Sequence, residues 1–100
     1  GELIMFETIR RYKGFPQDKM DEIVKRVTDG FVPIISASEG FIDFRFIDSG
    51  GGIVTTVSVF ETMETSVASN TAAANWVKEN LAEYNPSPPQ ITTGEVRIDK

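Results

Sequence analysis

Apolar and β-prone runs mark four segments of the chain as β-strands. Residues 2–12 (ELIMFETIRRY) and residues 91–99 form one such run near each end of the chain. Residues 40–49 and 53–61 flank a Ser-Gly-Gly-Gly turn, which predicts a β-hairpin. The pattern therefore predicts two outer strands and a central hairpin.

Two further segments have the apolar periodicity of helices. The first should start near Pro16, and Gly30 and Pro33 should kink or interrupt it near its end. Its apolar stripe comprises Met20, Ile23, Val24, Val27, Phe31, Ile34 and Ile35. Thr62 is the expected N-cap of a second helix that runs to about residue 84. The core stripe predicted for this helix is Val67, Thr71, Ala74, Val77, Leu81 and Tyr84.

The resulting order, β-α-β-β-α-β, is typical of an α+β ferredoxin-like fold with two helices on one face of an antiparallel sheet. One hundred residues suffice for one hydrophobic core of this kind. We therefore expect residues 1–100 to form a single domain.

The predicted strands carry large apolar side chains on both faces. In the second strand, Phe41 and Ile47 share one parity, whereas Phe44 and Phe46 share the other. Two helices can cover only one face, so the other face requires an apolar partner surface. A second copy of the chain is the simplest cover, and we therefore expect a homodimer that pairs sheet against sheet.

Composition excludes several classes of function. A net charge of −5 disfavours a nucleic-acid partner, because phosphates require a basic surface. The chain has neither cysteine nor histidine, which removes thiolate nucleophiles, imidazole bases and the commonest metal ligands, so no metal is expected. We find neither an apolar run of the ~18 residues that span a membrane nor a signal-peptide pattern, which favours a cytoplasmic protein with no membrane partner.

Short motifs at three junctions between elements resemble those of a known family. They are Lys13-Gly14 after the first strand, Glu39-Gly40-Phe41 at the start of the hairpin, and Phe60-Glu61-Thr62 before the second helix. Together they resemble the dimeric α+β barrel superfamily, and within it the antibiotic-biosynthesis-monooxygenase-like (ABM-type) domains. This resemblance covers nearly the whole chain and implies sheet-to-sheet dimers with a pocket between each sheet and its helices.

The resemblance also bears on cofactors. The family includes cofactor-independent monooxygenases that act on polycyclic aromatic phenols, enzymes that degrade haem, and members without known activity. In the haem degraders an Asn, a Trp and an axial His fall near Glu7, Ser69 and Glu79 of this chain, and all three are missing here. We therefore expect no cofactor.

Glu7 is the candidate catalytic residue. It shares a parity with Leu3, Met5 and Ile9, the side chains expected to lie beneath the helices. Burial there would raise the pKa of the carboxyl group and make Glu7 a general base for a phenolic proton, the step that cofactor-free oxygenation requires. The alternative is that Glu7 pairs with an arginine or lies at a wet rim.

Four residues are candidates for substrate binding. Trp76 either flanks a planar aromatic substrate or packs at the edge of the core. Asn70 and Asn75 are unfavourable within a helix, so each either bonds a ligand or faces solvent. Arg45 either orients a polar ligand or forms a surface ion pair with Asp43.

The basic group Arg10, Arg11 and Lys13 also has two interpretations. It either holds an acidic ligand at the end of the first strand or is a solvated strand end.

Two functions follow from these observations. The first is a cofactor-independent monooxygenase that acts on an aromatic or hydrophobic small molecule, with Glu7 as base and Trp76 as pocket wall. The second is a non-catalytic small-molecule-binding or structural homodimer of the same fold. The sequence leaves both open.

Overall fold

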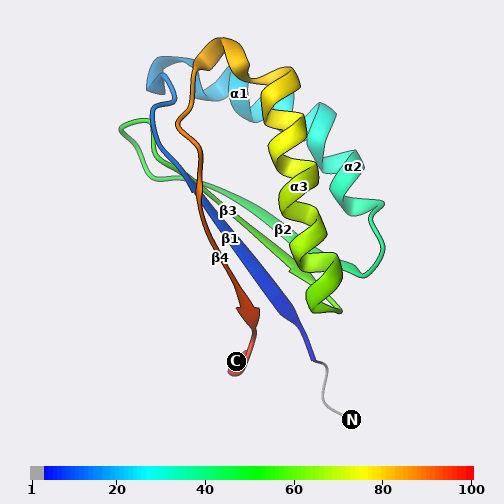
Figure 1. The fold of residues 1–100 in the computed structure, drawn as a ribbon. Helices are drawn as coiled ribbons and strands as arrows, with labels where there is room; N and C mark the ends of the chain where they lie inside the picture. Colours follow the sequence, from blue (N-terminus) through cyan, green and yellow to red (C-terminus); the bar gives the residue numbers. More distant parts are fainter. Residues whose placement is uncertain (1–3) are drawn as a thin grey trace.

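The computed structural model describes residues 4–100, so the first two predicted strand residues, Glu2 and Leu3, lie outside it. Four strands and three α-helices follow one another in the predicted order (Figure 1). They are β1 (Phe6–Tyr12), α1 (Met20–Arg26), α2 (Val32–Ser36), β2 (Phe41–Asp48), β3 (Val54–Phe60), α3 (Met63–Asn80) and β4 (Gln90–Glu95).

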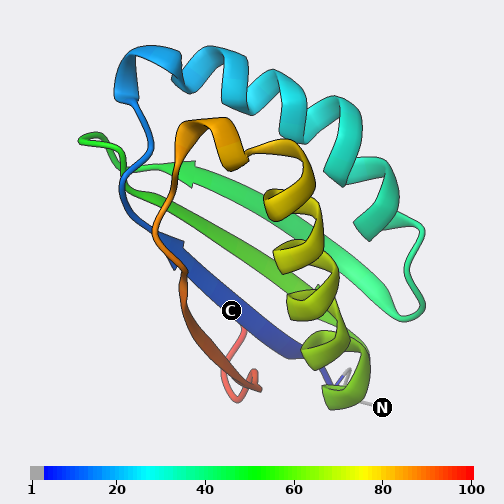
Figure 2. The same cartoon turned by 45° about the horizontal axis from the view of Figure 1, so that its top comes forward.

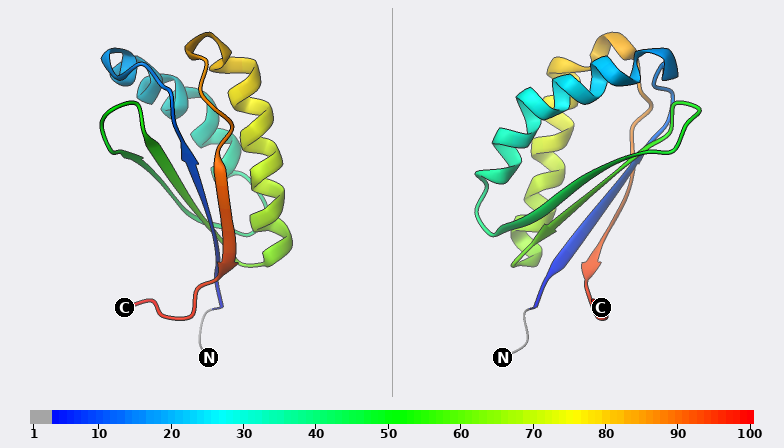
Figure 3. Two further views of the ribbon diagram at one scale, coloured as in Figure 1. Left: turned by 60° about the vertical axis from the view of Figure 1, so that its left-hand side comes forward. Right: turned by 180° about the vertical axis from the view of Figure 1, so that it is seen from behind.

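The strands form one antiparallel sheet in the order β2-β3-β1-β4. All helices lie on the same face of this sheet, and the other face is left open (Figures 2 and 3). This arrangement confirms the α+β ferredoxin-like fold. Within residues 4–100, no helix combines the length and the apolar character that crossing a bilayer requires.

The first helical segment is interrupted as predicted. A 3₁₀ turn, η1 (Gln17–Lys19), follows Pro16, and a π-helical turn, η2 (Val27–Phe31), separates α1 from α2. Its buried side chains follow a spacing of three or four residues and are Met20, Ile23, Val27, Phe31 and Ile35. Val24 and Ile34, also predicted for the stripe, flank this line and are 39% and 49% exposed.

Helix α3 begins as predicted but buries a different face. Thr62 is its N-cap, because the Thr65 amide donates a hydrogen bond of 3.1 Å to the Thr62 hydroxyl oxygen. The helix ends at Asn80, and the 3₁₀ turn η3 (Ala82–Tyr84) follows it. The predicted stripe is wrong at Val67, which is 50% exposed, and at Thr71 and Ala74, which are also exposed. The buried residues of the helix are Ser66, Ser69, Ala73 and Trp76.

Strand β1 turns toward the helices the face opposite to the one that the sequence predicted. Thr8 and Arg10 bond side chains of α3, so these residues face the helices. Side chains alternate along a strand, and Glu7 and Ile9 therefore lie on the open face. The expectation that the odd-numbered residues lie beneath the helices is wrong.

The open face combines apolar and charged side chains. Strand register places Val59 between Glu7 and Asp43, and in the next row Val57 between Ile9 and Arg45. The strands thus carry apolar side chains on both faces, as predicted, but charged residues flank those of the open face.

Candidate functional site: an aromatic cavity beside a buried arginine

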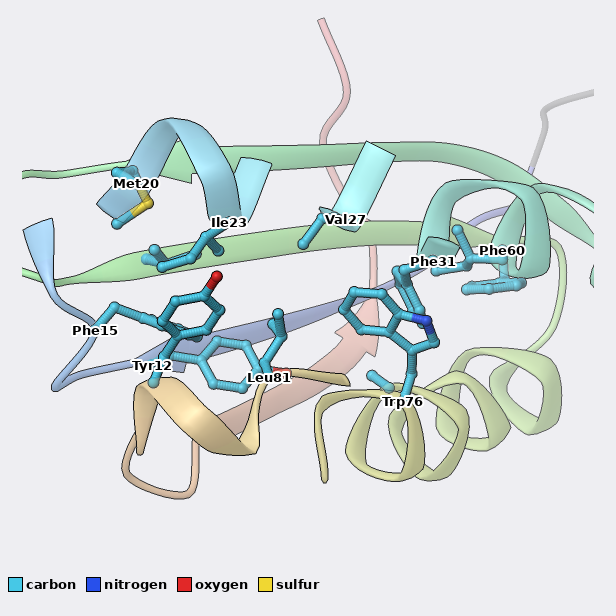
Figure 4. Packing of buried hydrophobic residues seen from close by; sticks show 13 residues of the cluster. Tyr12, Phe15, Met20, Ile23, Val27, Phe31, Phe60, Trp76 and Leu81 are labelled. Carbon is cyan, nitrogen blue, oxygen red and sulfur yellow. The ribbon is translucent and has the colours of Figure 1, made fainter. Parts of the chain in front are cut away.

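A cavity of about 30 Å³ lies between the helices and the sheet. Aromatic side chains dominate its wall: Phe31 is the central ring, with centroid distances of 5.6 Å to both Trp76 and Phe44. Figure 4 shows Trp76 and Leu81 pointing from the side of α3 into the same layer as Phe31 and Val27. The cavity has room for a single water-sized molecule.

The indole of Trp76 occupies its place because residue 30 is a glycine. A Cβ atom at Gly30 would lie 2.8 Å from Cζ2 of the indole, closer than packed atoms approach. Gly30 belongs to the π-helical turn η2, so the indole packs against the point at which the first helix is interrupted. Trp76 also borders a surface cleft between α1 and α3 and therefore separates this cleft from the cavity.

Among residues 4–100, Arg10 is the one charged residue that lines the cavity, and it is 1% exposed. On the sheet side, its Nε donates to the Thr56 hydroxyl (3.0 Å) and its Nη2 to the Ser58 hydroxyl (2.7 Å). On the helix side, its Nη1 donates to the Ser69 hydroxyl (3.3 Å) and to Oδ1 of Asn70 (2.9 Å). The guanidinium thereby links β1 and β3 to α3.

The four side-chain acceptors that bond Arg10 are all neutral. In residues 4–100 no carboxylate lies within ion-pair distance of it. Burial lowers the pKa of Arg10 from its ordinary value, and the neighbouring hydroxyl of Tyr12 offsets part of this effect. Burial likewise raises the pKa of Tyr12, which lines the same cavity. The cavity thus has an aromatic wall and one cationic group.

The structure separates the predicted site residues. Trp76 lies at the cavity, 8% exposed. Asn70 accepts hydrogen bonds of 2.9 Å from both Arg10 and the Thr8 hydroxyl, so its Oδ1 is already bonded within the protein. Asn75 is exposed. Glu7 lies on the open face of the sheet, away from the cavity.

Arg45 has the surface role that was the alternative to ligand binding. It lies on the edge strand β2 and pairs with Asp43 at 3.2 Å, with 69% of its side chain exposed. Arg10, in contrast, was expected at a solvated strand end or on an acidic ligand, and it is fully buried. A signal for this burial exists in the sequence, since Thr8 and Tyr12 share the parity of Arg10 and small hydroxyl residues recur on β3 and α3.

Metal chemistry has no evident ligand set here. The described part of the chain contains no group of three acidic, histidine or cysteine side chains placed to hold a metal ion.

Solved structures with the same fold include enzymes of the ABM type. The monooxygenase ActVA-Orf6 of Streptomyces coelicolor, in complex with nanaomycin D, matches with a TM-score of 0.73 and 16% identity over 97% of this chain and 91% of that one. The haem degrader MhuD of Mycobacterium tuberculosis, with two haems in its active site, has a TM-score of 0.69 and 20% identity over 95% and 98%. A protein of unknown function from Nitrosomonas europaea has a TM-score of 0.76 and 18% identity over 100% and 96%.

These similarities establish the fold. No family model matches the sequence, and a search of the curated proteins finds no significant match. The chain has the fold of the ABM-type proteins, as its short motifs predicted.

The network around Arg10 predicts unequal roles for the two asparagines of α3. Asn70→Ala removes one acceptor from a buried cation, and we expect it to lower the free energy of unfolding by about 1.5–3 kcal/mol. Asn75→Ala, on the exposed side of the same helix, should change it by less than about 0.5 kcal/mol. Urea denaturation followed by circular dichroism measures both, and equal effects would contradict the network's role in stability.

Proposed function

We propose that this protein binds a small aromatic or hydrophobic molecule in the cavity between its helices and its sheet. The observation that supports this best is the convergence of Phe31, Phe44 and Trp76, from three separate elements, on a space that also contains the charged Arg10. Apolar walls with few polar groups are typical of small-molecule sites.

Binding of such a molecule requires the cavity to open. Its volume of about 30 Å³ is below the ~300 Å³ at which small-molecule sites begin. The half-buried Phe44 and Phe46 line it from the edge strand β2, so a movement of their rings would enlarge it. The complex of ActVA-Orf6 with nanaomycin D supports the proposal, because that protein shares the fold.

The binding proposal is tested with a neutral fluorescent naphthylamine, N-phenyl-1-naphthylamine, excited through Trp76. We expect one molecule to bind per chain with energy transfer from the indole. Ala73→Val narrows the cavity, since Ala73 is 3% exposed and lines it. This variant should bind at least about tenfold more weakly, a loss of ~1.4 kcal/mol.

Ala68→Val is the matched control, because Ala68 is exposed on the same helix and the substitution has the same cost in helix propensity. It should bind like the wild type. Absence of binding, or equal loss in both variants, would contradict a ligand site in this cavity.

Cofactor-independent oxygenation is the second candidate function. It is favoured by the fold shared with the monooxygenase ActVA-Orf6. In such a reaction a phenolic substrate loses its proton, and O₂ then oxidises a ring CH₂ to a carbonyl, one oxygen atom entering the product and the other leaving as water. A base at Glu7 would have to act on the open face, because Glu7 does not line the cavity.

An oxygen electrode tests this second candidate with an anthrone as substrate. Turnover predicts uptake of one O₂ per anthrone consumed, faster than the uncatalysed reaction. If turnover occurs at the cavity, Glu7→Gln should retain it and Ala73→Val should reduce it. A rate equal to that of buffer alone, with binding intact, would leave the protein a non-catalytic binder.

We further propose that the chain forms a homodimer through the open face of its sheet. Support comes from Ile9 and Val57, half-buried apolar side chains on the face of the sheet opposite the helices. Light scattering at low micromolar concentration should give twice the chain mass of 11.1 kDa. Val57→Asp should yield a monomer, whereas Val24→Asp, on a helix, should remain dimeric; a monomeric wild type would refute the proposal.

A further inference from the structure

The buried charge of Arg10 points to the chemical class of the ligand. Four of the five N–H groups of the guanidinium donate to protein oxygens, and all four acceptors are neutral side chains. Hydrogen bonds to neutral oxygens satisfy donors but do not balance a charge, and a buried charge without a counter-ion is strongly unfavourable. The hydroxyl of Tyr12 is a further neutral neighbour of the guanidinium.

The position of this charge connects it to the cavity. Arg10, its partner Thr56 and the neighbouring Tyr12 line the cavity, and the remaining wall is mostly aromatic or aliphatic. A ligand that fits this distribution has an apolar ring and one polar group. Because no carboxylate of residues 4–100 pairs with this cation, the complementary group is a single anionic oxygen.

We propose that the ligand of this cavity is an aromatic monocarboxylate, which places one carboxylate oxygen against Arg10 and its ring against Trp76 and Phe31. This inference rests on the proposed binding function and adds the ligand's charge. A carboxylate is favoured over a phenol because it is ionised at neutral pH, with a pKa near 4 rather than near 10. It supplies the missing counter-ion without first losing a proton.

Calorimetric titration with matched naphthalene compounds tests the charge separately from the ring. We expect 2-naphthoate to bind the wild type at least about tenfold more tightly than 2-naphthamide, which has the same shape without the charge. The neutral phenol 2-naphthol should resemble the amide. The preference should persist at high salt, because a buried pair is screened far less than an exposed one.

Two variants assign the preference to one residue. Arg10→Met should abolish the preference for naphthoate over naphthamide while the amide still binds. Arg11→Gln removes the next cation, which is exposed on the opposite face of β1, and should retain the preference. The comparison of acid and amide in the wild type decides the inference even if Arg10→Met does not fold.

The outcomes separate this inference from the proposed function. Equal affinity for naphthoate and naphthamide would overturn the carboxylate inference and leave an uncharged binding site. Tighter binding of 2-naphthol than of 2-naphthoate would also overturn it, in favour of a phenolic ligand. If neither the naphthalene compounds nor N-phenyl-1-naphthylamine bind, the proposed function itself is overturned.

Discussion

One buried guanidinium joins the sheet of this protein to its longest helix. Arg10 extends from β1 and donates hydrogen bonds to hydroxyl groups of β3 and to side chains of α3. The side of α3 that faces Arg10 carries the short polar residues Ser69 and Asn70, which accept its hydrogen bonds, in place of large apolar residues. The apolar residue Val67 consequently points outward.

The interior is therefore divided into two halves of different character. Around Thr8, Ser58 and Ser66 the layer between helix and sheet is polar, and all three residues are completely buried. Toward the other end of α3 it is aromatic, around Phe31 and Trp76. The cavity lies where the two halves meet, which is why its wall includes both indole and guanidinium.

Much of the architecture could be predicted from local patterns. The order of elements, the cap at Thr62, the interruption near Gly30 and the surface pair of Arg45 with Asp43 all depend on neighbours in sequence. The face of β1 depends on distant partners instead. The number of apolar residues favoured burial of the face of β1 that carries Ile9. The acceptors that stabilise Arg10 in the interior lie on β3 and α3, far away in sequence.

The candidate site was predictable to a similar extent. Trp76 was expected either beside an aromatic substrate or at the edge of the core, and it is a buried residue that lines the cavity. Glu7 was assigned to the pocket only because the odd-numbered residues of β1 were expected to face the helices. That expectation was wrong, and the assignment of Glu7 is therefore wrong as well. Arg10 was interpreted as part of a solvated strand end or of an acidic-ligand site, and its burial was missed because a basic residue near a strand end is normally solvated.

The same network has a consequence for how the molecule opens and closes. Its bonds join residues 46 to 60 positions apart, and the two bonds to Ser69 and Asn70 cannot form while α3 and the sheet are separate. A partly undocked helix would leave the cation surrounded by protein yet without these two acceptors, which is costlier than either the closed or the fully solvated state. Strand β1, strand β3 and helix α3 should therefore exchange their amide protons as a single cooperative unit, with the edge strands opening independently of them.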